Sequence, residues 1–165
     1  MTPKTPSRPQ LVGARQQRIH DLLSRLVSEG VADFFADACG IQSRDYVFRT
    51  KSHIVSHLIR EVESGVREVL KTLPAARNFL EDNPPANKGT HAAQVKAVLS
   101  ALGLTNEAVA EKWRSFAGDE GWHSTAHRRV LGRPRSYDAE FAARFDRMVD
   151  VLAVDGMRRP LPPTG

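Results

Sequence analysis

The stretch SHIVSHLIREVESGVREVLKTL, residues 52–73, decides the fold of this chain. Its apolar residues recur at every third or fourth position, which is the period of an α-helix with one apolar face. The stripe consists of Ile54, Leu58, Val62, Val66, Val69 and Leu73, flanked by Val55, Ile59 and Leu70. A helix of this length spans roughly 30 Å, the diameter of a small domain. We therefore expect it to be the central helix, capped by Ser52 and ended by Leu73 and Pro74.

Helical periodicity also occurs on both sides of this stretch. The sequence predicts further helices over Arg15 to about Val27, through Phe34 and Phe35 to a stop at Gly40, about Thr90 to Leu102, onward from Thr105, Trp122 to Leu131, and onward from Ser136. The last of these has Phe141, Phe145, Met148 and Leu152 along one side. No segment of useful length alternates with the period of a β-strand. The prediction is an all-α, single-domain bundle of five to seven helices around a long central helix.

The two ends of the chain differ in composition from its middle. Residues 1–13 contain three prolines and no periodic pattern, so we expect a disordered tail there. Residues 156–165 form a second tail rich in proline and arginine. The helical bundle is accordingly predicted over residues 14–155.

The net charge of +5 on 165 residues is a weak guide to binding partners. Each tail contributes +2 and contains no acidic residue, which leaves +1 for residues 14–155. Nucleic-acid binding therefore has to be argued from a local basic patch and not from the overall charge.

Composition also bears on location. No run approaches the roughly 18–20 apolar residues that span a bilayer, and the N-terminus has no apolar segment of the kind found in secretion signals. The single cysteine, Cys39, lies in FFADACG and is predicted to be a small buried thiol. We expect a cytoplasmic protein without a membrane partner.

Four of the six histidines form two pairs spaced four residues apart, His53/His57 and His123/His127. Residues at this spacing share one face of a helix. The first pair continues to Glu61 and points away from the apolar stripe of its own helix. It is interpreted as a solvated polar face, with a ligand site or a protein interface as alternatives. Since the chain has neither an H-E-x-x-H motif nor a cysteine cluster, no metal and no cofactor are predicted.

The second pair lies beside the apolar side of its predicted helix. His123 and His127 are therefore expected to be partly buried. They are interpreted either as structural residues that brace the bundle or as a general acid/base pair facing a phosphate. Histidine suits the second role because its ordinary pKa of about 6.5 is close to neutral pH.

A basic segment adjoins the second histidine pair. Its cations are Arg128, Arg129, Arg133 and Arg135, with no acidic residue among them. The planar guanidinium group matches phosphate oxygens, and Trp122 at the edge of the segment is suited to stacking on a base. The alternative is a solvated turn whose arginines pair with acids of the last helix. On the central helix, Arg60 and Arg67 are each expected to pair with Glu63 on the surface.

The chain resembles an uncharacterised group of bacterial helical domains over about residues 20–152. The likeness rests on HIVSHLIREVESGVREVL (residues 53–70), Trp113, WHSTAHRRVLGRPR (residues 122–135) and the last helix. That group is similar to HEPN domains, which are helical bundles that often bind or cleave RNA in toxin–antitoxin and antiphage systems. The resemblance implies an RNA-directed role.

The chain departs from the HEPN signature, an arginine followed after four to six residues by a histidine near the end of the bundle. Arg114 and His123 are separated by eight residues. Arg15 and His20 have the required spacing but lie in the first predicted helix. An HEPN-like bundle without catalytic activity therefore stays open as an alternative.

Two functional hypotheses follow, and a metal site built from His53, His57 and Glu61 is a third and weaker possibility. In the first, the domain is a metal-independent ribonuclease. His123 or His127 transfers the proton, and Arg60, Arg128 and Arg129 stabilise the phosphate charge. In the second, it is a non-enzymatic module that binds a partner protein or forms a homo-oligomer. The second hypothesis predicts an exposed apolar patch from Phe34 and Phe35, from Val47 and Phe48, or from the last helix.

Overall fold

The computed structural model describes residues 11, 13–43, 49–82, 95, 98–99, 112–113, 122, 126 and 136–153. Of these residues, 89% are helical and none is in a strand, which confirms the predicted all-α fold. The helices with defined bounds are α1 (Ala14–Leu26), α2 (Glu29–Ser43), α3 (Lys51–Thr72), α4 (Pro74–Asp82) and α8 (Ala139–Ala153).

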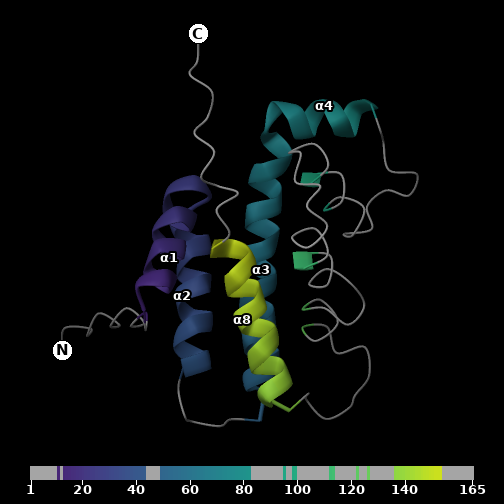
Figure 1. Cartoon of the computed structure of the whole chain (residues 1–165). Coiled ribbons are helices and arrows are strands. Elements are labelled where there is room, and N and C mark those ends of the chain that lie inside the picture. Colours follow the sequence, from purple (N-terminus) through teal and green to yellow (C-terminus); the bar gives the residue numbers. More distant parts are fainter. Residues whose placement is uncertain are drawn as a thin grey trace, which may run out of the picture.

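Helix α3 is the longest of these helices, and α1 and α2 lie to one side of it (Figure 1). Helix α2 packs against both α1 and α3, and α1 also contacts α8. Arg15 on α1 forms an ion pair with Asp150 on α8. Helix α4 turns away at the end of α3, as Figure 1 shows.

The core is closed around one face of α3. This face consists of Val55, Ile59, Val62 and Val66, all fully buried. The other helices contribute Ile19 and Leu23 from α1, Phe35 and Cys39 from α2, and Phe141, Phe145, Met148 and Leu152 from α8. The predicted inner residues of the last helix are therefore confirmed, and so is the burial of Cys39.

The buried face of α3 is displaced from the predicted stripe. Ile54 begins the predicted stripe but is 37% exposed, whereas Val55 is fully buried. The cause is that the buried arc extends over polar positions, which an apolar pattern does not count. Ser52, Ser56 and Arg67 are all buried on that flank of α3.

Two glycines of the bundle lie where neighbouring helices pack closely. Gly40 does not end α2 as predicted; it is buried, and the helix continues to Ser43. Packing in the core outweighs the low helix propensity of glycine at this position. Gly65 on α3 faces α2, and a Cβ atom there would lie 2.6 Å from Val31 Cγ2. The absence of a side chain at Gly65 therefore allows the two helices to approach closely.

The helix ends follow partly from the sequence. Leu73 is extended, with φ −63° and ψ 135°, and Pro74 begins α4, so the predicted end of α3 is confirmed. The predicted cap at Ser52 is wrong, because α3 begins at Lys51 and Ser52 is buried within its first turn. Helix α8 is capped by Asp138 rather than by Ser136, since Asp138 Oδ1 accepts a hydrogen bond of 2.9 Å from the backbone N–H of Phe141.

Between α4 and α8 the structure describes single positions only. Val95, Val98 and Leu99 are buried, as predicted for the inner side of that segment. The bounds of the three helices predicted there, and nearly all of both predicted tails, lie outside the described residues. In the described part of the chain, no helix is both long enough and apolar enough to cross a membrane.

Candidate functional site

The first histidine pair lies on α3, on the side away from its fully buried apolar face. The ring centroids of His53 and His57 are 4.7 Å apart, and the ring planes are nearly perpendicular at 83°. Both side chains are partly exposed. The predicted placement of this pair on one shared helix face is confirmed, although the face is only partly solvated.

Arg60 extends the same side of the helix by one turn. Its Nη2 atom lies 2.6 Å from Glu61 Oε1, and its Nε donates a second hydrogen bond of 3.2 Å to the same oxygen. The sequence spacing favoured Glu63 as the partner of Arg60, whereas the observed ion pair is with the adjacent Glu61. The Glu61 carboxylate thus partly neutralises the charge of the Arg60 guanidinium group.

The pairing of Glu61 with Arg60 also bears on metal binding. The spacing of His53, His57 and Glu61 suggests three ligands on one helix face, but the Glu61 carboxylate is held by Arg60. Within the described ranges, no three His, Cys, Asp or Glu side chains are grouped to hold an ion.

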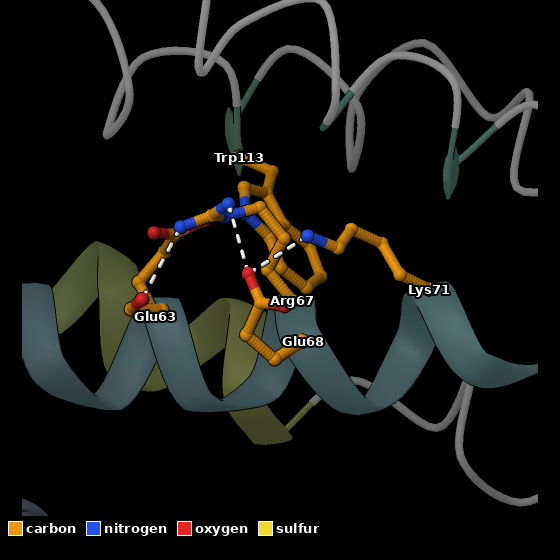
Figure 2. A network of polar contacts seen from close by, with 6 residues as sticks. Glu63, Arg67, Glu68, Lys71 and Trp113 are labelled. Atoms are coloured by element: carbon orange, nitrogen blue, oxygen red, sulfur yellow. Dashed lines mark hydrogen bonds and ion pairs between the residues drawn. The ribbon is translucent and has the colours of Figure 1, made fainter. Parts of the chain in front are cut away.

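A second polar cluster lies at the border of the buried face of α3. Glu63 and Arg67 form an ion pair with 3.4 Å between Oε1 and Nε. Their side chains are only 12% and 10% exposed, so this is a buried pair and not the surface pair that was predicted. Trp113 Nε1 donates a hydrogen bond of 3.3 Å to Glu63 Oε1, which joins a position 50 residues further along the chain to α3 (Figure 2).

The cluster continues toward solvent along α3. Arg67 Nη2 donates to Ser64 Oγ at 3.2 Å, and Arg67 Nη1 lies 3.4 Å from Glu68 Oε1. Lys71 Nζ lies 2.8 Å from the same Glu68 oxygen (Figure 2). The hydrogen bond from Lys71 lowers the pKa of the Glu68 carboxyl group. Positive and negative groups alternate along the cluster, so it compensates its own charges and binds Trp113 to the helix.

The structure describes only two residues in the region of the basic segment and the second histidine pair. His123, His127, Arg128, Arg129, Arg133 and Arg135 lie outside the described residues. Trp122, at the edge of that segment, is 1% exposed and packs edge to face on Phe141, with ring centroids 5.2 Å apart. Ala126 is buried as well. Trp122 is thus a core side chain here, and stacking on a base would require the indole ring to leave the core.

Sequence reasoning missed a buried cation at the junction of three elements. Lys51, the first residue of α3, is buried, and its Nζ donates a hydrogen bond of 3.1 Å to the backbone carbonyl of Gln42 near the end of α2. The same ammonium group lies 4.2 Å from the ring centroid of Tyr137, just before α8. A lysine between two helices is ordinarily expected to be exposed, so the sequence did not indicate its burial. The one available signal was its position next to the predicted helix cap, where neighbouring elements come together.

Comparison of the chain with protein-family models, with curated proteins and with solved structures finds no match. A function is therefore inferred from the side chains of α3 and from the elements packed against this helix.

Proposed function

We propose that this HEPN-like bundle binds RNA over the side of α3 that carries His53, His57 and Arg60, and that it cleaves RNA without a metal ion. The observation that supports the proposal is the grouping of two contacting imidazole rings with a guanidinium group one turn further along the same helix. Guanidinium groups bind phosphate oxygens, and imidazole nitrogens form hydrogen bonds with them. This side of α3 is therefore suited to binding the RNA backbone.

The proposed reaction assigns the proton transfers to the second histidine pair. One of His123 and His127 takes the proton from a ribose 2′-hydroxyl, and the resulting oxygen attacks the neighbouring phosphorus. The bond from phosphorus to the 5′ oxygen breaks, and the other histidine protonates that oxygen. Arg60, Arg128 and Arg129 stabilise the negative charge on the phosphate oxygens. Burial of Trp122 and Ala126 supports the proposal, because each directly precedes one of the two histidines and is held in the core.

The catalytic assignment is tested by replacing His127 with alanine. We expect His127→Ala to abolish RNA cleavage while the helix content and unfolding temperature stay close to those of the parent chain. His20→Ala is the matched control, since His20 lies on α1 and has no part in the proposed site. Cleavage that is undiminished in His127→Ala would contradict the assignment.

The binding face is tested through the Arg60–Glu61 ion pair. Glu61→Gln removes the carboxylate that competes with RNA phosphate for Arg60, so RNA affinity is expected to rise. Glu81→Gln is the control, because it changes the net charge equally and also removes an arginine partner, Arg77 on α4. Arg60→Ala is expected to weaken binding and to reduce the slope of log affinity against log salt by about 0.7, the value for one phosphate contact of a single strand. Equal effects of Glu61→Gln and Glu81→Gln would show that only overall charge matters.

One observation favours the second candidate, a protein-interaction or oligomerisation module. Phe34 on α2 is 38% exposed, as the apolar-patch hypothesis requires. The rest of the predicted patch is weaker, because Phe35 and the large apolar side chains on the inner side of α8 are buried, and Val47 and Phe48 lie outside the described residues. Measuring molecular size with and without RNA separates the candidates. An oligomer that dissociates in Phe34→Ser and ignores RNA favours the module, and a species that grows on adding RNA favours RNA binding.

A further inference from the structure

The spacing of the His53 and His57 rings matches that of two imidazoles bound to one metal ion. With metal–nitrogen bonds of about 2.0–2.1 Å and an angle of about 90–110° at the ion, two imidazole centroids lie roughly 4.5–5.2 Å apart. The observed centroid separation is 4.7 Å. Both rings project from one face of a regular helix, and rotation about their side-chain bonds would turn one nitrogen of each ring toward a common ion.

We infer that His53 and His57 form a two-nitrogen binding site for a divalent transition-metal ion such as Ni²⁺, Cu²⁺ or Zn²⁺. Imidazole nitrogen is a preferred ligand of these ions, whereas Mg²⁺ and Ca²⁺ prefer oxygen. Water completes the coordination of the ion.

The charges around the histidine pair permit a cation. Arg60 lies one turn beyond His57 and would repel a metal ion if its charge were uncompensated. The Glu61 carboxylate pairs with it at 2.6 Å, so the two groups together carry no net charge. Glu61 is not a ligand in this arrangement, and its replacement tests the point. Glu61→Gln removes the negative charge next to Arg60 and should weaken metal binding, whereas it should strengthen RNA binding.

The experiment measures Ni²⁺ binding by calorimetry with no RNA present, so its result is separate from that of the proposed RNA function. Because His123 and His127 are the other histidine pair at this spacing in the sequence, the chain studied carries His123→Ala and His127→Ala. In this background we expect one Ni²⁺ site per chain. Adding either His53→Ala or His57→Ala should weaken binding about ten-fold or more, because the remaining imidazole loses the benefit of a linked second ligand. His20→Ala is the control and should leave the affinity unchanged.

A second measurement uses the parent chain, so that the inference can be tested even if the chain with His123→Ala and His127→Ala fails to fold. Ni²⁺ is paramagnetic in octahedral coordination, so substoichiometric Ni²⁺ should broaden the ring-proton NMR signals of His53 and His57 before that of His20. Affinity unaffected by His53→Ala and His57→Ala, or equal broadening of His20 and the pair, would overturn the inference.

Discussion

The two sides of helix α3 show how differently one element is used. On one side, Val55, Ile59, Val62 and Val66 are fully buried against the other helices, and folding alone accounts for them. On the other side, two imidazole rings and a guanidinium group remain partly exposed and lie outside the hydrophobic core cluster. The Glu63–Arg67 pair lies at the border between them. Stability should therefore depend on the first side and the border, and ligand binding on the second.

The largest effect is expected on the apolar side. Ile59→Ala removes a fully buried side chain and leaves a cavity, so the free energy of unfolding should fall by about 3–4 kcal/mol. Ile54→Ala makes the same chemical change at a 37% exposed position and should cost less than about 1 kcal/mol. Urea unfolding of both variants measures the difference. Equal losses would show that the buried face is centred on the originally predicted stripe.

A substitution at the border should lower the free energy of unfolding, as one on the apolar side does, although the border residues are charged. Arg67→Met removes the cation that pairs with the nearly buried Glu63 carboxylate beside Trp113, and we expect a loss of about 3 kcal/mol. The control is Arg77→Met on α4, whose ion pair with Glu81 has the same four-residue spacing but side chains that are 69% exposed. That change should cost less than about 0.5 kcal/mol.

A double variant separates the charge effect from the loss of packing. Glu63→Gln combined with Arg67→Met removes both charges and keeps an oxygen that accepts the hydrogen bond from Trp113. The double variant should recover most of the stability that Arg67→Met loses. If it is no more stable than Arg67→Met, the aliphatic part of the arginine, and not its charge, holds the border together.

The contrast between the two ion pairs explains what could be predicted from the sequence. The four-residue spacing predicted that Glu63 meets Arg67, and this pair forms. Arg77 and Glu81 have the same spacing and also form a pair. Burial is decided by contacts distant in the chain, such as that of Trp113 with Glu63, and local spacing carries no information on these. The same limit applies to Gly40, where packing overrides a local stop signal, and to Ser52, which is buried instead of capping α3.

For the candidate site as well, the sequence predicted the helix face but not the partner of each side chain. The period of 3.6 residues places His53, His57 and Arg60 on one side of α3, and this is observed. It does not determine which acid Arg60 pairs with, because Glu61 and Glu63 are both within reach and the choice depends on side-chain torsions and neighbouring groups. Trp122 was predicted to stack on a base because it borders a basic segment, whereas a large aromatic ring gains more from burial against Phe141.

The exclusion of water from the apolar side is tested by the pH dependence of stability. Burial raises the pKa of the Cys39 thiol from 9.0 to about 12. Above pH 9 the unfolded chain releases this proton while the folded chain retains it, so stability falls as the pH rises from about 9 toward about 12. Between pH 8 and pH 10 the thiol should account for a loss of about 1.4 kcal/mol. Cys39→Ala should lack this component in urea unfolding, and identical pH profiles would show that water reaches the thiol.

The smallest change in the free energy of unfolding is expected on the polar side of α3. A small change there would indicate that the side chain serves binding and not stability. His57→Ala removes a partly exposed imidazole from a helix in which alanine is the more favourable residue, so the free energy of unfolding should change by less than about 0.5 kcal/mol. The same variant should lose Ni²⁺ affinity in the calorimetric experiment. A histidine that braces the bundle would show the opposite pattern, with a loss of stability above about 1.5 kcal/mol and no specific change in binding. Thermal and urea unfolding of His57→Ala therefore decide whether the two sides of α3 divide stability and binding between them.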